Sequence, residues 1–129
     1  MEIKDFTYLV ETEKSHDEAT VSVLKAIESQ GWTVFNIYDI KERLAAKGFK
    51  QDPLKIIEIC SGKYANSLLN KNKLISLCMP CKINVFMENG KVKIAGMRPT
   101  ILSKFFREIK KEEVEEVEKV IKEIIDNSK

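Results

Sequence analysis

The chain has 129 residues, of which 43% are hydrophobic and 33% are charged, so it is long enough to bury a core without metal or disulfide supports. Its 22 basic and 20 acidic residues leave a net charge of only +2, so the chain lacks the excess of basic residues that nucleic-acid binding requires, and we expect no nucleic-acid partner. No stretch is apolar enough to cross a membrane, and the charged start lacks the apolar segment of a signal peptide, so we expect a cytoplasmic protein without a membrane partner.

The first third of the chain predicts two strands separated by a helix. Residues 6–12 (FTYLVET) are rich in β-branched and aromatic side chains, which favours a strand. Ser15 and Glu18 have the spacing of a capping box, and Gly31 supplies the left-handed residue that commonly ends a helix. Residues 32–40 (WTVFNIYDI) predict the second strand.

The middle of the chain predicts two short helices, a strand and a hairpin. Residues 41–48 predict a helix, residues 54–60 (LKIIEIC) a strand, and residues 63–71 a second helix. Residues 77–97 alternate between apolar and polar on both sides of Asn89–Gly90, a dipeptide that supplies the positive φ angles of a two-residue turn. We therefore expect a hairpin there.

The C-terminal residues 111–127 predict an amphipathic helix. Its apolar stripe consists of Val114, Val117, Val120, Ile121, Ile124 and Ile125. Glu118 and Lys122 are assigned to the solvent side as an i,i+4 ion pair, whereas residues 100–109 could be helical or irregular. The order β-α-β-α-β-α-β-β-α indicates one α+β domain over residues 1–129, a two-layer sandwich with helices on one face of a mostly antiparallel or mixed sheet.

Cys78 and Cys81 form a C-x-x-C pattern, the spacing of a redox dithiol or of half a zinc site. The residues after Cys81 predict a strand, so no helix N-terminus is present to stabilise a thiolate. Along a regular strand Cys78 would share a face with Lys82 and Asn84, away from Cys81. One C-x-x-C supplies only two zinc ligands, so we predict no metal site.

Cys60 and Cys81 form a second candidate pair, because each stands at one end of a predicted strand. If these strands are neighbours, the two thiols approach each other. The alternative is that both cysteines pack as small hydrophobic residues, as buried cysteines commonly do. The sequence leaves both interpretations open.

The segment Ser61–Gly62–Lys63 lies between a strand and a helix start, where backbone N–H groups, a hydroxyl and an ammonium group could hold an anion. The second glycine of a P-loop is absent, and an ordinary helix cap explains the same residues. Arg98 could bind a ligand carboxylate or could simply lie on the surface.

Two further titratable residues are candidates with ordinary alternatives. Glu58 would act as an acid or base if it were buried within its apolar strand, and would be solvated if that strand were at a sheet edge. His16 is interpreted as a surface residue of a first helical turn. No complete catalytic constellation or cofactor motif is present, so enzymatic activity and any cofactor stay undefined.

Residues 39–49 (DIKERLAAKGF), 54–69 (LKIIEICSGKYANSLL) and 76–94 (SLCMPCKINVFMENGKVKI) resemble the domain-of-unknown-function family number three-zero-two, DUF302. The matching positions include Cys60 and Pro80–Cys81. The chain departs from the family pattern at Ser61–Gly62, where Asn-Pro is common, and at Cys78, where a large aliphatic residue is usual. The resemblance implies a compact α/β sandwich that is often a homodimer, and implies no reaction.

These observations favour a non-enzymatic module that binds a small molecule or an anion and acts as a homodimer. The residues expected at the ligand are Ser61, Gly62, Lys63 and Arg98. The alternative is a thiol-dependent protein, in redox, sulfur or metal handling, that uses Cys60 and Cys81 with Cys78 as an accessory. A third hypothesis is an interaction role for the C-terminal helix.

Overall fold

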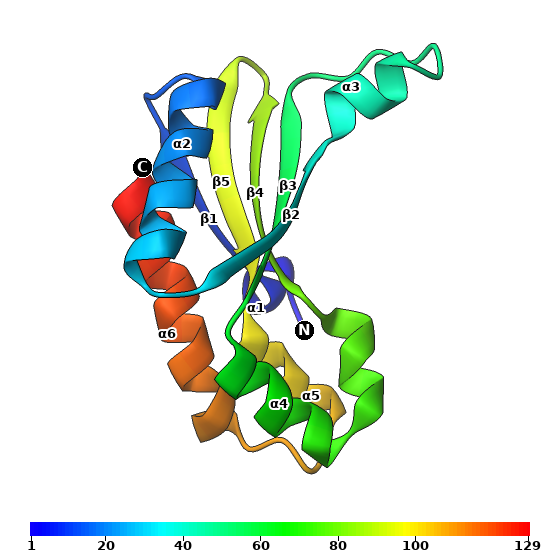
Figure 1. The fold of residues 1–129 in the computed structure, drawn as a ribbon, viewed down its shortest axis with the longest axis vertical. Helices are drawn as coiled ribbons and strands as arrows, with labels where there is room; N and C mark the ends of the chain where they lie inside the picture. The colour runs from blue at the N-terminus through cyan, green and yellow to red at the C-terminus, as the bar shows by residue number, and fades with distance from the viewer.

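A five-stranded antiparallel sheet forms the centre of the fold, with the strand order β1-β5-β4-β3-β2 (Figure 1). The structure is a computed structural model that describes residues 1–129. The strands are β1 (Thr7–Thr12), β2 (Thr33–Asp39), β3 (Leu54–Cys60), β4 (Cys81–Glu88) and β5 (Lys91–Met97). The predicted α+β class is confirmed, the five strands follow one another along the chain as expected, and the sheet is antiparallel rather than mixed.

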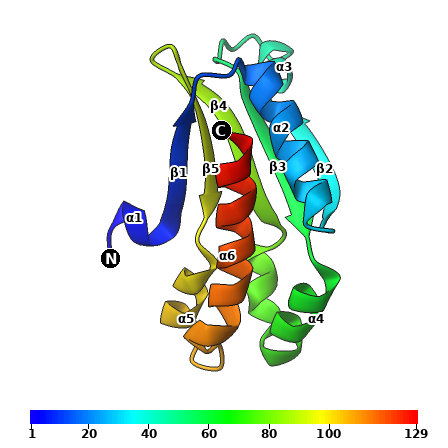
Figure 2. The ribbon, with the colours of Figure 1, turned by 90° about the vertical axis from the view of Figure 1, so that its left-hand side faces the viewer.

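Two long helices, α2 (His16–Ser29) and α6 (Lys111–Ser128), lie side by side over one face of the sheet (Figure 2). The core between the layers is built from inward-facing aliphatic residues of β3, β4, β5 and both helices. Its largest members include Val23, Ile27, Ile57, Ile59, Ile83, Val85, Ile94, Ile121, Ile124 and Ile125. No long helix covers the other face (Figure 1). Because successive side chains of a strand point to opposite faces, each strand has residues on the covered face and residues on the uncovered face.

Local sequence signals set the two ends of α2 as expected. The Ser15 hydroxyl accepts from the Glu18 backbone N–H at 3.1 Å, and Gly31 has φ +72° after the helix end. His16 differs from its surface interpretation, because its Nε2 lies 2.9 Å from the carbonyl oxygen of Val85. His16 therefore joins the first turn of α2 to the central strand β4.

Gly96 on β5 allows the close approach of α6 to the sheet. A Cβ at this position would lie 3.2 Å from Ile125 Cδ1 and 3.3 Å from Ile121 Cγ2. The hairpin that contains β5 turns at Asn89 and Gly90, whose φ angles are +54° and +76° as the turn requires. β1 then pairs with β5, so that Thr7 lies opposite Met97.

The remaining elements lie at the two ends of the sheet. They are α1 (Ile3–Phe6), α3 (Ile40–Ala45), α4 (Gly62–Lys71), the 3₁₀ segments η1 (Lys73–Cys78) and η2 (Pro99–Ile101), and α5 (Leu102–Phe105). α3 projects beyond one end, whereas α4, η1 and α5 gather at the other (Figure 1). A second cluster of buried residues there consists of Leu68, Ile75, Leu102, Ile109 and Val114.

Two local expectations are corrected or resolved at this end. Cys78 ends the 3₁₀ segment η1 and is not part of β4, although it does line one hollow with Lys82 and Asn84. Cys81 lines the same hollow, so the expected separation of Cys78 from Cys81 is not found. The ambiguous residues 100–109 contain most of η2 and all of α5. None of the helices is long and apolar enough to cross a membrane.

Candidate functional site

A cavity of about 430 Å³ lies where the ends of β3 and β4 meet α4 and η1. Eleven of its fourteen lining residues are hydrophobic. Aromatic rings come from Trp32, Phe35 and Tyr64, sulfur atoms from Cys60, Met79 and Cys81, aliphatic groups from Ile59, Ala65, Leu68, Leu69, Pro80 and Val117, and hydroxyls from Ser61 and Ser76. We call this space the apolar cavity.

The pairing of β3 with β4 brings two cysteines to the apolar cavity. Ile59 lies opposite Cys81 in the antiparallel register, so Cys60 is one residue beyond the partner of Cys81. Both cysteines line the cavity, and neither forms a disulfide. The condition set by the sequence, that the two strands be neighbours, is met.

The environment keeps both thiols protonated at neutral pH. Burial raises the pKa of Cys60. Burial also raises the pKa of Cys81, to about 11, with a smaller contribution in the same direction from Cys60 and an opposing one from Lys82. Neutral thiols in an apolar wall behave as packing groups rather than nucleophiles. No group of three or more His, Cys, Asp or Glu side chains is arranged to hold a metal ion.

The residues of the predicted anion loop, Ser61–Gly62–Lys63, do not all line the same cavity. Ser61 is the N-cap residue of α4, but its side chain makes no capping hydrogen bond and lines the apolar cavity instead. Gly62 is the first residue of α4, and a Cβ there would meet no atom within 4 Å. Lys63 lines a separate shallow hollow with Glu113, and its Nζ lies 5.8 Å from the centre of the Tyr64 ring. Of the three predicted loop residues, only Ser61 therefore offers a polar side chain to the cavity, which also contains the Ser76 hydroxyl.

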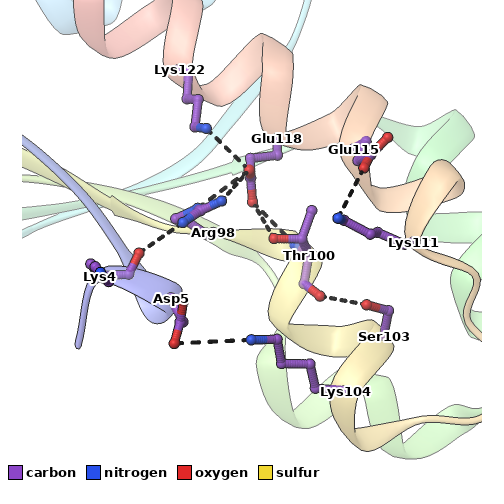
Figure 3. Close-up of polar contacts among 10 residues, drawn as sticks. All are labelled: Lys4, Asp5, Arg98, Thr100, Ser103, Lys104, Lys111, Glu115, Glu118 and Lys122. Atoms are coloured by element: carbon purple, nitrogen blue, oxygen red, sulfur yellow. Dashed lines mark hydrogen bonds and ion pairs between the residues drawn. The ribbon is translucent and has the colours of Figure 1, made fainter. Parts of the chain in front are cut away.

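Arg98 does not line the apolar cavity and is committed to an ion pair (Figure 3). Its Nε and Nη2 donate to the same carboxylate oxygen of Glu118 at 3.3 and 3.2 Å, and its Nη1 donates to the Lys4 carbonyl at 2.8 Å. The other Glu118 oxygen accepts from the Thr100 hydroxyl at 2.7 Å and from the Thr100 N–H at 3.2 Å. This arrangement indicates a structural role for Arg98.

Glu118 is a residue that sequence reasoning misplaced, because only 5% of it is exposed. Lys122 does pair with it, at 3.2 Å, as the i,i+4 spacing predicted, but on the covered side. Burial alone would raise the pKa of Glu118, but hydrogen bonds from Thr100 and Arg98 outweigh burial and lower it. Its spacing from Val114 and Ile121, four and three residues away, was the available signal of burial.

Glu58 lies on the uncovered face, half-buried, opposite Lys82 on β4. Its strand is not at a sheet edge, because β3 lies between β4 and β2. A hydrogen bond with Glu58 raises the pKa of Tyr38 on the neighbouring strand. Glu58 is thus a partner of Tyr38 and lies outside the apolar cavity.

Comparison with known proteins identifies relatives of the chain. The family model described as "Domain of unknown function DUF302" matches residues 8–128. The crystal structure of an uncharacterized conserved DUF302 protein from Bacillus stearothermophilus is similar, with a TM-score of 0.87 and 28% sequence identity. The similarity covers 96% of this chain and 98% of that chain. No curated protein matches the chain.

Proposed function

The chain belongs to the DUF302 family of domains of unknown function, and within that family we propose that it is a non-enzymatic homodimeric module that binds a small molecule in the apolar cavity. The observation that carries the proposal is the cavity itself, which has a volume of about 430 Å³ and an almost wholly hydrophobic lining. Ligand sites in proteins have this size, this apolar lining and a few polar groups that orient the ligand.

The lining defines the class of ligand. Trp32 and Tyr64 lie with ring centres 6.1 Å apart and planes inclined by 51°, and both rings contribute to the cavity. Aromatic and sulfur-containing walls favour an apolar, ring-containing body. Ser61 provides a hydroxyl without a capping bond at the start of α4, where a carboxylate or other acceptor is favoured. We therefore expect an aromatic carboxylate rather than an inorganic anion.

The thiol-dependent alternative has one supporting observation, because Cys60 and Cys81 line the same cavity. Thiol chemistry requires a thiolate, and burial raises the pKa of both thiols. A binding role needs no thiolate and uses the two side chains as part of an apolar wall. The geometry and the pKa directions together favour binding over thiol reactivity.

Exposed apolar residues beside α1 and α5 support the homodimer. Met1, Ile3 and Phe105 are 73%, 76% and 67% exposed and border one shallow hollow. Apolar patches of this kind often mark protein interfaces. Sedimentation velocity would test the proposal with Phe105→Glu, which should dissociate the dimer, and with Val21→Glu on α2 as the control. A wild-type chain that stays monomeric at all concentrations would remove the dimer and leave the cavity proposal intact.

Trp32 provides a direct test of ligand binding, because it is the only tryptophan and lines the cavity. Titration with 1-naphthoate should quench or shift Trp32 fluorescence in a saturable way. Ala65→Phe fills the cavity and should abolish the response, whereas Ala46→Phe, at an exposed position directly after α3, should retain it. A response that is absent, or equal in both variants, would contradict the proposal.

A further inference from the structure

The uncovered face of the sheet carries a second hollow, of about 450 Å³, beside the start of β4. Phe6, Pro80 and Met97 give it apolar walls, and Lys82 and Asn84 are among its polar residues. We call it the sheet-face hollow. Pro80 and Cys81 line both this hollow and the apolar cavity, so the two spaces lie on either side of the chain that leads into β4.

Asn84 is the unusual residue of the sheet-face hollow. Its Oδ1 is the one buried side-chain oxygen or nitrogen without a hydrogen-bond partner in the structure. The core residues Ile83 and Val85 face the helices, so Asn84 points to the uncovered side. Its neighbours across the sheet are Ala95 and Ile56, whose side chains carry no donor.

An unpaired buried acceptor is unfavourable, and in native proteins most such groups are paired. A primary amide has an N–H donor next to its oxygen acceptor. Both are satisfied at once by a planar group that presents an acceptor to the N–H and a donor to the oxygen. In protein–DNA complexes, asparagine recognises the edge of an adenine base through two hydrogen bonds of this kind. The Oδ1 atom is covered in the free protein, so the amide must turn toward the hollow to pair with such a group, and the small side chain of Ala95 beside it leaves room for that turn.

We propose that the sheet-face hollow binds a small planar molecule with a carboxamide-like edge, read by the Asn84 amide, with its ring against Phe6 and Met97. Lys82 lies two residues from Asn84 on the same face and hydrogen-bonds only the Pro80 carbonyl, at 3.3 Å. Its remaining donors are placed for an anionic substituent on the same molecule. This site is separate from the apolar cavity and does not depend on the function proposed for it.

The test is a pair of NMR titrations of the ¹⁵N-labelled full chain, with nicotinamide and with methyl nicotinate. The two probes share a ring, but the ester lacks the N–H donor. Nicotinamide should shift the side-chain amide signal of Asn84 and the backbone signals of Ala95 and Met97. Methyl nicotinate should bind about tenfold more weakly, the ratio that one hydrogen bond supplies.

Asn84→Leu tests the role of the amide without endangering the fold. It removes an unpaired polar group, so the melting temperature should stay the same or rise. The variant should lose the preference for nicotinamide, whereas Asn66→Leu on exposed helix α4 should keep it. The proposal is overturned if nicotinamide causes no shift at Asn84, if both probes bind equally, or if Asn84→Leu retains the preference.

Discussion

Arg98 and Glu118 form a two-point ion pair in which Nε and Nη2 of the arginine reach one oxygen of a carboxylate that is 5% exposed. The pair connects the end of β5 to the middle of α6, and Thr100 occupies the other carboxylate oxygen. The end of the sheet that carries the apolar cavity is therefore held to α6 by charge-assisted hydrogen bonds.

Removal of the arginine should reveal the strength of this connection. Arg98→Ala leaves the buried Glu118 carboxylate with fewer donors, and hydrogen bonds to charged groups contribute about 1.5–3 kcal/mol each. Because Arg98 donates two such bonds to Glu118, we expect the free energy of unfolding in urea to fall by at least about 1.5–3 kcal/mol. Lys111→Ala is the control, because its pair with Glu115 is exposed and such pairs contribute about 0.3–0.5 kcal/mol. Equal losses in the two variants would contradict the structural role.

Glu118 should make stability depend on pH in the acid range. Its folded-state pKa is lowered from the ordinary value of 4.5, so the unfolded state takes up a proton first as the pH falls. The contribution of Glu118 is therefore complete above pH 4.5 and disappears as the pH falls through the lowered pKa. Urea unfolding at a series of pH values should give a flatter acid limb for Glu118→Gln. Glu112→Gln, at an exposed position, should keep the wild-type profile.

A side chain at Gly96 should destabilise the fold, in contrast to one at Gly62. The Cβ of Gly96→Ala would approach Ile125 Cδ1 at 3.2 Å and the Lys82 carbonyl oxygen at 3.3 Å, so these neighbours must shift by a few tenths of an ångström. Overpacking of this kind typically costs about 1–3 kcal/mol. Gly62→Ala meets no atom within 4 Å and should be neutral or slightly stabilising. Thermal unfolding of both variants would compare them, and equal melting temperatures would be the contrary result.

Alkylation should distinguish packed thiols from reactive ones. Because the pKa of Cys81 is raised to about 11, its reaction with iodoacetamide should accelerate with pH throughout the alkaline range. Mass spectrometry of peptides labelled at each pH would give the rate for each cysteine. A rate for Cys81 that already reaches its plateau near neutral pH would show a stabilised thiolate and would favour the thiol-dependent alternative.

Local patterns in the sequence predicted the elements because each pattern acts within a few residues. The capping box of Ser15 and Glu18 and the turn at Asn89–Gly90 are complete within four and two residues, and both form as expected. The amphipathic helix was predicted over residues 111–127 and spans Lys111–Ser128 for the same reason.

The apolar cavity could not be predicted in this way, because it depends on contacts between distant segments. The pairing of Ile59 with Cys81 sets the position of both thiols, and no local pattern specifies that register. Glu118 shows the same limit. Its local partner Lys122 suggested a solvent position, whereas Arg98 and Thr100, 20 and 18 residues earlier, determine its burial.

The first strand of the chain pairs with the last, since Thr7–Thr12 lies alongside residues 92–97. The β1 segment therefore cannot take its place in the sheet before the hairpin of β4 and β5 has been synthesised. Its Tyr8 and Val10 pack on the main core only in the finished sheet. The contacts of β1 thus join segments far apart in the sequence, and contacts of large sequence separation are slow to form during folding.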